Sequence, residues 1–458
     1  MVEDKEPVIS FDSFLFPRIF RSFRMSIQPS KLVLAFAAVA TICVVGWIMD
    51  FSQTVVVRPA HALSAPGGIS TAIRRPGGTT ELDVYVMFPS ELDEFIAAPD
   101  GAGRAGVFHT LQRFGSEQFH RALYAIFELD VAGFSRSIAN GVHALIWAFR
   151  WHTLYSVIFF AILLASMALA GGAICRVAAL QFAGAERPGL RQAARFGRRK
   201  FVSLLVAPLV PFAVVAIIGL FFIALPGLIG SIPVAGELLT GLLLPLSLVA
   251  AFIIAGGLVA AVPGTNLMFA AIAYEDSDSF DSISRSLSSV YSRPWHMGFY
   301  TLVAVVYGAV CYIFVRFFAF LMLWTTYQFL QLGFLSNEKL HGIWAEPTFA
   351  DLLGAMTNAT TPPDTWSLWI AWLLIRVWGM VIVGVVVAFL VSFYFSANTV
   401  IYALMRNRVD GTPLNEVYIR PEETAAEPVP SEAPREETAS EPGQTPRDED
   451  KEEGKTSG

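Results

Sequence analysis

The chain contains 458 residues, of which 54% are hydrophobic and only 15% are charged, whereas ordinary globular proteins are roughly 25% charged. This number of charged side chains is too small to cover the surface of soluble domains. The composition therefore excludes a soluble protein and predicts a polytopic membrane protein. The net charge of −6 comes from the C-terminal tail, because residues 421–458 hold 12 acidic and 4 basic residues and the rest of the chain sums to +2.

The first apolar run is Leu32–Met49, with 18 residues. It is longer than the roughly 7–15 apolar residues of a secretory signal, so we expect an uncleaved transmembrane anchor. Over residues 11–24 before it, aromatic residues alternate with Arg18, Arg21 and Arg24. This composition predicts a helix in the headgroup layer that binds anionic lipid. The alternative is a flexible basic flank that only orients the span.

Residues 50–150 are predicted to form an extracytoplasmic loop. Its first half is rich in Gly and Pro, with one strand expected at Leu82–Phe88. Between residues 106 and 150 the apolar residues recur at helical spacing, which predicts two amphipathic helices that cover the outer mouth of the bundle. We expect the second of them to run directly into the second span.

The remaining spans follow from the same physical limit. A bilayer core of about 30 Å needs roughly 20 apolar residues in a helix, because every backbone polar group must be satisfied internally. Five further charge-poor stretches meet this requirement: Trp151–Cys175, one within Phe201–Gly236, one within Leu238–Tyr274, one beginning near Met297 and one ending near Met405. The sequence therefore predicts an all-α polytopic bundle of about six spans.

Lys and Arg in the short loops predict the orientation of these spans. With the N-terminus inside, the cytoplasmic segments carry 16 basic residues and the short outer loops carry only Lys339. Both termini are thus expected in the cytoplasm, with the protein in a bacterial inner membrane. The tail from residue 421 is rich in Pro and Glu and lacks aromatic residues, so we expect it to be disordered, as a solvated extension or as a docking segment for a basic partner.

An internal repeat is expected on the cytoplasmic side. When the chain is shifted by 90 residues, Phe182–Arg195 resembles Ile272–Arg285, and a fainter copy lies at Arg408–Val417. The pattern predicts a short amphipathic helix after every even-numbered span. Asp278 and Ser279 provide an N-cap for the second copy.

Several segments of the sequence also resemble a known family: Phe14-Leu-Phe16, Arg21-x-x-Arg24, Gln28-Pro-Ser-Lys31, Ser279-Phe-Asp-Ser-Ile-Ser-Arg285, Arg293-Pro-Trp295, Asn398-Thr-Val-Ile-Tyr402-x-x-x-Arg406 and Asp410-Gly-Thr. Together they resemble an uncharacterised group of bacterial polytopic membrane proteins, which is loosely similar to the membrane domain attached to some glycerophosphodiester phosphodiesterases. The resemblance covers most of residues 13–50 and 165–419. It implies a six-helix membrane bundle and no established chemistry.

No motif predicts catalysis, a cofactor or a metal site. Gly101-Ala-Gly103-Arg-Ala-Gly106 matches GxGxxG, but no βαβ unit surrounds it, and the cysteines Cys43, Cys175 and Cys311 all lie in apolar runs. The acidic residues Glu275, Asp276, Asp278 and Asp281 could hold a divalent cation. A solvated turn that caps the next helix is the favoured interpretation. We expect no cofactor and no nucleic-acid partner.

Two sets of arginines are candidates for contacts with lipid or another anion. One set, in the loop after the second span, is Arg187, Arg191, Arg195, Arg198 and Arg199. Its spacing of three to four places most of the set on one helical face, where anionic lipid is the simplest partner. The alternative is that these charges only enforce topology. The second set is Arg316 and Arg376. They either snorkel separately to the outer interface or converge on one anion, which would be a phospholipid headgroup or a carboxylate such as that of Glu128 or Asp130.

The function predicted from these features is that of a non-enzymatic integral membrane protein. It would act as a scaffold or accessory subunit that binds anionic lipid and an unidentified cytoplasmic partner. A permease-like transporter, or a membrane subunit of one, is the alternative, and a lipid-active enzyme is not excluded. The expected organisation is an interfacial segment at 1–31, an anchor at 32–49, an outer loop at 50–150, a five-span bundle at 151–405 and a cytoplasmic C-terminal segment at 406–458.

Overall fold

The computed structural model describes residues 15–58, 61–64, 70–73, 78–97, 103–185, 188–333, 337–349, 352 and 365–419. The chain divides into two units, Met1–Tyr418 and Ile419–Gly458, and the second contributes one described residue, Ile419. The expected disorder of the tail therefore concerns residues outside the described part. The described chain is mostly helical, which confirms the predicted all-α class.

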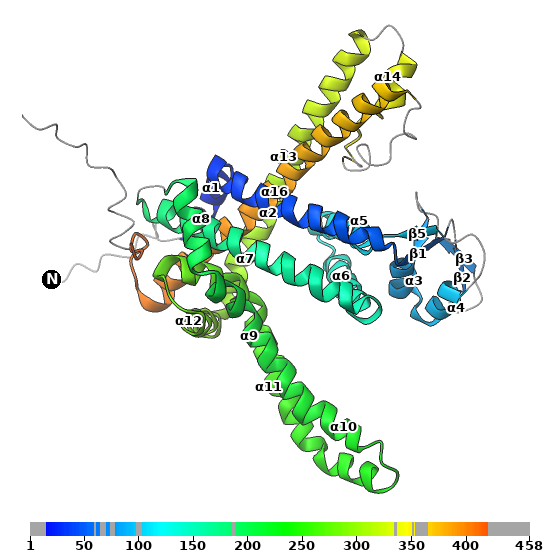
Figure 1. Cartoon of the computed structure of the whole chain (residues 1–458). Coiled ribbons are helices and arrows are strands. Elements are labelled where there is room, and N and C mark those ends of the chain that lie inside the picture. Colours follow the sequence, from blue (N-terminus) through cyan, green and yellow to red (C-terminus); the bar gives the residue numbers. More distant parts are fainter. Residues whose placement is uncertain are drawn as a thin grey trace, which may run out of the picture. The chain divides into compact units, whose positions relative to one another are not determined.

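Six helical segments are long and apolar enough to cross a membrane, so the predicted number is confirmed. They are α2 (Pro29–Met49), α7 (Thr153–Ala183), α9 (Phe201–Gly219) with the π-helical turn η5 (Leu220–Ala224) and α10 (Leu225–Ile229), α11 (Ala235–Glu275), α13 (Pro294–Gly333) and α16 (Trp366–Asp410). Figure 1 shows three neighbouring pairs, α2 with α7, α9 with α11, and α13 with α16. Little of the third and fourth spans is buried inside the chain, whereas α7 is the most buried of the six.

Short helices gather at one end of these spans, which we call the inner end because the sequence predicts that it faces the cytoplasm. They are η2 (Phe16–Phe20), α1 (Arg21–Ser26), α8 (Leu190–Arg199) and α12 (Ser279–Ser292). The helices α8 and α12 follow the second and fourth spans, as the sequence predicts. The third expected helix is absent from the described residues after α16, where residues 411–419 contain only a turn at 414–415. Gly411, at φ 68°, adopts the left-handed conformation that ends α16.

The first short helices, η2 and α1, pack on the bundle instead of lying free of it. Ile19 and Met25 are buried, and the Phe23 ring contacts the rings of Phe314 and Phe389 in the fifth and sixth spans. The predicted helix before the first span is therefore present from Phe16, and the part at residues 11–14 lies outside the described residues.

The outer segment contains more regular structure than the sequence analysis expects. The strand β1 (Val55–Arg58) lies between β4 (Thr79–Thr80) and β5 (Gly103–Ala105) in an antiparallel sheet, and β2 (His61–Ser64) pairs with β3 (Ser70–Ile73). The strand expected at Leu82–Phe88 is wrong, because α3 (Glu81–Met87) occupies those residues. A capping box of Thr80 and Asp83 starts this helix and satisfies its first backbone donors. The remaining short elements are η3 (Asp50–Ser52), η4 (Pro89–Glu91), α4 (Leu92–Ala97) and α14 (Asn337–Ile343).

The two predicted amphipathic helices of the outer segment are present as α5 (Val107–Glu128) and α6 (Val131–Trp151). The prediction that the second of these helices runs directly into the second span is wrong. The backbone leaves the helical conformation at His152 (φ −128°, ψ 49°), so α6 ends there. The His152 side chain contacts Thr54 (Nδ1 to Oγ1, 3.2 Å) and the Trp147 ring. These contacts connect the break to α6 and to the residue that precedes β1.

Asp50, just past the end of the first span, holds the start of α5. Its Oδ1 accepts hydrogen bonds from the backbone N–H of Phe108 (2.8 Å) and the hydroxyl of Tyr155 (3.0 Å), and its Oδ2 accepts from the N–H of His109 (2.8 Å). A carboxylate at this place satisfies free donors of the first helical turn and complements the helix dipole. Further along α5, Phe119 and His120 pack on Tyr312 of α13. The helix α5 thus bridges the first and fifth spans.

Candidate functional site

The basic helix α8 lies between the second and third spans and packs through a small apolar face. Ala193, Phe196 and Gly197 are buried, and Gly197 is needed there because a Cβ atom would lie 2.5 Å from the carbonyl oxygen of Leu169 in α7. Basic residues fill the last turn of α8, where they complement the negative end of the helix dipole. This close packing fixes which side of α8 faces outward.

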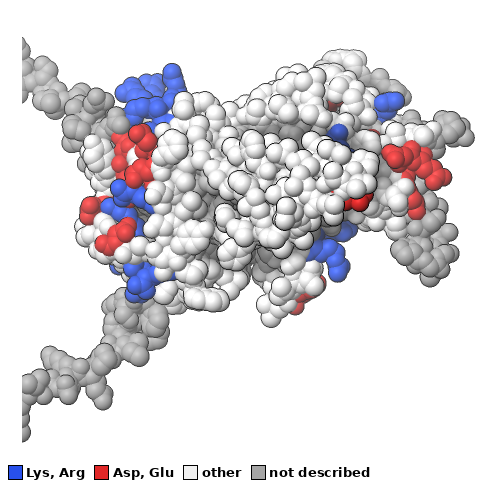
Figure 2. All heavy atoms as spheres, turned by 90° about the horizontal axis from the view of Figure 1, so that it is seen from below, with Lys and Arg blue, Asp and Glu red and all other residues white. Residues whose placement is uncertain are grey.

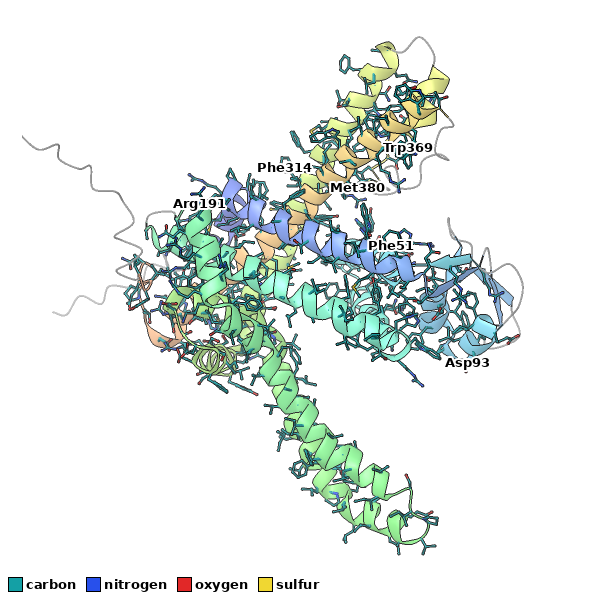
Figure 3. The ribbon with its side chains drawn as sticks, in the orientation of Figure 1. Phe51, Asp93, Arg191, Phe314, Trp369 and Met380 are labelled. Atoms are coloured by element: carbon teal, nitrogen blue, oxygen red, sulfur yellow. The ribbon has the colours of Figure 1, made fainter. Side chains whose placement is uncertain are left out.

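Arg191, Arg195 and Arg198 project from that outward side. All three are exposed, and their spacing of four and three residues places them on one helical face. None has a hydrogen-bond or ion-pair partner among the described residues. Figure 3 labels Arg191 at this place on α8. Arg187, the remaining member of the expected set at the start of the loop, lies outside the described residues.

Arg199 and Lys200 turn toward the protein instead. Arg199 Nη2 lies 3.5 Å and Lys200 Nζ 3.2 Å from Oδ1 of Asp276, and Lys200 Nζ also donates to the backbone oxygens of Asp276 (2.6 Å) and Ser277 (3.2 Å). These residues tie the end of α8 to the end of α11. Arg199, which we had grouped with the lipid-facing arginines, therefore has an internal partner.

Glu275 is the centre of a second group of charges. Its Oε1 accepts from the Tyr402 hydroxyl (2.7 Å) and lies 3.4 Å from Nε of Arg406, and its Oε2 lies 2.9 Å from Nη1 of Arg285. Arg285 also binds Asp281, and this hydrogen bond, with the charges of Glu275 and Asp281, raises the pKa of its guanidinium. The cluster joins α11, α12 and α16.

The interpretation of this acidic segment as a solvated turn that caps α12 holds in part, because the side chains of Asp278 and Asp281 are 88% and 46% exposed. Asp278 occupies the N-cap position of α12, but its side chain makes no capping hydrogen bond. For Glu275 and Asp276 the interpretation is wrong, because their side chains are 12% and 3% exposed. Opposite charges from distant helices compensate the cost of removing these carboxylates from water. Among the described residues no group of three or more His, Cys, Asp or Glu could hold a metal ion.

Two buried cations at the same end were missed by the sequence analysis. Arg176 donates to the backbone oxygens of Ala273 (2.8 Å) and Tyr418 (2.9 Å), and Lys31 Nζ donates to Gln181 Oε1 (3.0 Å) and contacts Ser396 Oγ (3.5 Å). Each is the charge that bounds an apolar run, which was the signal available in the sequence. Their partners lie up to 365 residues away, so the pairing could not be inferred.

A cavity of about 360 Å³ opens beside Lys31. It is lined by Phe23, Arg24, Ile27, Gln28, Pro29 and Gln181. Its walls combine apolar groups with one exposed guanidinium, and Gln28 Oε1 is buried there without a hydrogen-bond partner. The cavity thus adds a basic and partly apolar surface to the end of the bundle that carries α8.

Arg316 and Arg376 are held by different parts of the outer region. Arg316 is buried, donates to the backbone oxygen of Phe349 (2.8 Å) and lies over the Phe349 ring, whereas Arg376 lies 5.0 Å from the centre of the Trp372 ring. Asp130, an expected partner, accepts from the N–H of Gly133 and caps α6. That the two arginines share one anion stays a prediction.

His120 adds a polar group beside Arg316. Its Nε2 lies 3.3 Å from the Tyr312 hydroxyl and its Nδ1 lies 2.7 Å from the backbone oxygen of Ser116. Burial and the nearby charge of Arg316 lower the pKa of His120 below its ordinary 6.5. The imidazole is therefore neutral at pH 7.

The charges have a simple distribution over the described surface. On the face in Figure 2, Lys, Arg, Asp and Glu gather at two ends, and a broad band without charge lies between them. This is the pattern expected of a chain with a hydrocarbon layer around its middle.

One family of known domains matches this chain. The family described as Domain of unknown function (DUF7847) matches residues 141–397, which include four of the six long apolar helices in full and most of α16. No curated protein and no solved structure matches the chain.

Proposed function

The chain belongs to the DUF7847 family of domains of unknown function, and from this premise we propose that it is a non-enzymatic multi-pass membrane protein that binds anionic lipid at its inner end. It would act there as a scaffold or accessory subunit for a cytoplasmic protein. Both termini would lie in the cytoplasm of a bacterial cell. The membrane bundle would be loosely similar to the membrane domain of some glycerophosphodiester phosphodiesterases.

The observation that carries the proposal is the contrast between two groups of basic residues at one end of the bundle. Arg176, Arg199 and Lys200 bind acceptors within the chain. Arg191, Arg195 and Arg198 sit on one exposed face without such partners. Cations on a rigid helix beside the end of an apolar span lie at the height of lipid phosphates, and each is worth about 1 kcal/mol near an anionic surface.

The absence of catalytic motifs in the sequence supports the non-enzymatic part of the proposal. The permease-like alternative stays a prediction. It would need polar groups along the third and fourth spans, and Phe201–Leu225 contains no charged residue.

The test replaces Arg191, Arg195 and Arg198 together by Gln in the full chain in mild detergent. Binding of short-chain phosphatidylglycerol is measured by calorimetry. Three contacts of about 1 kcal/mol predict up to roughly a 100-fold loss of affinity. Binding by the unaltered chain should weaken as salt is added.

Replacement of the same three residues by Lys is the matched control, because it keeps the charge and the stem of each side chain. This variant should bind within a few-fold of the unaltered chain. Unchanged affinity in the Gln variant would overturn the proposal. If the Gln variant instead inverts its topology in cells, the charges serve as orienting signals only.

A further inference from the structure

The outer helix α6 has three distinct faces. Its buried face consists of Ser137, Ala144, Trp147 and Ala148, which pack toward α3, α5 and the start of α7. Opposite lies an apolar stripe whose members are each at least 43% exposed: Val131, Ile138, Val142, Leu145, Ile146 and Phe149. The stripe runs the whole length of the helix. A single exposed apolar side chain needs no explanation, but a continuous row of six does.

A row of basic side chains lies along one border of this stripe. Arg136, His143 and Arg150 follow one another at intervals of seven residues, and seven residues return to within about 20° of the same direction on a helix. All three are exposed. At 100° per residue this row falls between the apolar stripe and the buried face. Arg136 and His143 have no hydrogen-bond or ion-pair partner among the described residues, and Arg150 lies 6.0 Å from the Trp151 ring.

The height of α6 can be found by counting residues along the second span. Gln181 marks the inner end, because it accepts a hydrogen bond from Lys31 at the start of the first span. Phe149 of α6 stacks on Phe160, with ring centres 5.2 Å apart. Phe160 is 21 residues outward from Gln181, or about 32 Å at 1.5 Å per residue, and a hydrocarbon core is about 30 Å thick. The end of α6 thus lies at the outer edge of that layer.

The stripe also continues the exposed apolar surface of α7. Leu154 and Val157, in the first turns of that span, are 77% and 53% exposed. They follow Phe149 directly across the break at His152. A surface shared with a membrane span in this way is covered by whatever covers the span.

We propose that α6 is an interfacial helix whose apolar stripe lies among the acyl chains of the outer leaflet and whose basic row binds lipid phosphates. Phosphates form a layer at one height, and the two guanidinium groups of Arg136 and Arg150, with the imidazole of His143 between them on one border of an apolar stripe, match such a layer. A second copy of the chain would need apolar complementarity but no row of basic side chains on one border. The inference concerns the opposite end of the spans from α8 and does not depend on the lipid site there.

The test measures which solvent surrounds spin labels on α6 in the full chain. The chain is reconstituted into vesicles of phosphatidylcholine and phosphatidylglycerol. Separate variants carry Ile138→Cys, Val142→Cys or Ile146→Cys on the stripe. Cys43→Ala removes the most accessible native thiol from the parent, because Cys175 and Cys311 are buried, and labelling of this parent sets the background. Collision rates are recorded with oxygen, which concentrates in lipid, and with a water-soluble nickel chelate.

Two matched controls give the reference environments. Glu128→Cys lies at the exposed end of α5, two residues before the N-cap of α6, and Ala144→Cys lies on the buried face of α6. We expect oxygen to exceed nickel at the three stripe positions by several-fold, the reverse at Glu128, and low rates for both reagents at Ala144. Because the stripe positions are exposed and are tested in separate variants, failure of one to fold leaves the others decisive.

Two results would overturn the proposal. Nickel rates at Val142 and Ile146 equal to those at Glu128 would show that the stripe faces water. Low rates for both reagents at these positions, as at Ala144, would show that protein covers the stripe, either a second copy or another segment.

Discussion

At the scale of single residues, the charges near α8 and α12 matter through their partners more than through their number. Glu275 lies within reach of Arg285, Arg406 and Tyr402, contributed by two helices other than its own. The sequence analysis identified the acidic segment but assigned it to solvent. The carboxylates of Glu275 and Asp276 can be buried because basic side chains from other helices lie beside them, and only the folded chain brings these groups together.

Replacing Glu275 by Gln should destabilise the bundle. The change keeps a hydrogen-bond acceptor for Tyr402 but leaves Arg406, whose side chain is 14% exposed, with the 61% exposed Glu416 as its counter-charge (Nη2 to Oε1, 3.6 Å). We expect a loss of about 2–3 kcal/mol in the free energy of unfolding, below the 3–5 kcal/mol for a fully buried pair because Arg285 is half exposed. Thermal unfolding in detergent would measure it.

Asp281→Asn provides the control for Glu275. It removes an exposed (i, i+4) pair with the same Arg285, which is worth only about 0.3–0.5 kcal/mol. Equal effects of the two substitutions would contradict the special role of the buried carboxylate.

The lowered pKa of His120 should make the free energy of unfolding depend on pH. Its pKa is lowered in the folded chain, with burial as the main cause, so the unfolded chain binds more protons as the pH falls below about 6.5. Stability should be constant above that pH and decrease as the pH falls toward the folded-state pKa. His120→Gln, which keeps a polar group opposite Tyr312, should show a smaller decrease between pH 7 and pH 5 in thermal unfolding. An unchanged decrease would show that other groups cause it.

At the scale of elements, hydrophobic periodicity located helices better than it located their ends or the sheet. The helices α5, α6, α8 and α12 are present where the spacing placed them. The strand expected at Leu82–Phe88 is a helix, because the capping box at Thr80 and Asp83 outweighed the β-branched residues after it. The break after α6 depends on contacts of His152 with Thr54, 98 residues away, and no local pattern encodes it.

Gly197→Ala tests how closely α8 must approach α7. The added Cβ atom would meet the backbone oxygen of Leu169, which cannot move without displacing a span. We expect α8 to shift outward, with lower thermal stability and higher protease sensitivity of the loop after the second span. Gly298→Ala is the control, because nothing lies within 4 Å of its new Cβ atom. This control should be neutral or stabilising by about 0.4–1 kcal/mol. Similar behaviour of the two variants would contradict the close approach.

At the scale of the whole molecule, the six long apolar helices are established but their direction through a membrane is a prediction. The positive-inside rule places the end with α8 and α12 in the cytoplasm. A reporter that is active only outside the cytoplasm should be active after Ala60, Ser231 or His341 and silent after Arg195, Ser288 or Thr412. Activity at Arg195 would reverse the orientation, because that loop contributes 7 of the 16 basic residues on the expected cytoplasmic side, more than any other segment.

The number and positions of the spans can be predicted from the sequence alone, and so can the alignment of Arg191, Arg195 and Arg198. These are local properties, since a helix in hydrocarbon must be apolar along its own length and a helical face follows from residue spacing alone. Only the tertiary structure decided which charges remain in solvent. In the sequence, Lys31, Arg176 and Glu275 do not differ from other charges at the ends of apolar runs. In the structure, segments far away in the chain bury their side chains and form hydrogen bonds with them. The cost of burying a charge is compensated by partners that the fold, and not the local sequence, brings within reach.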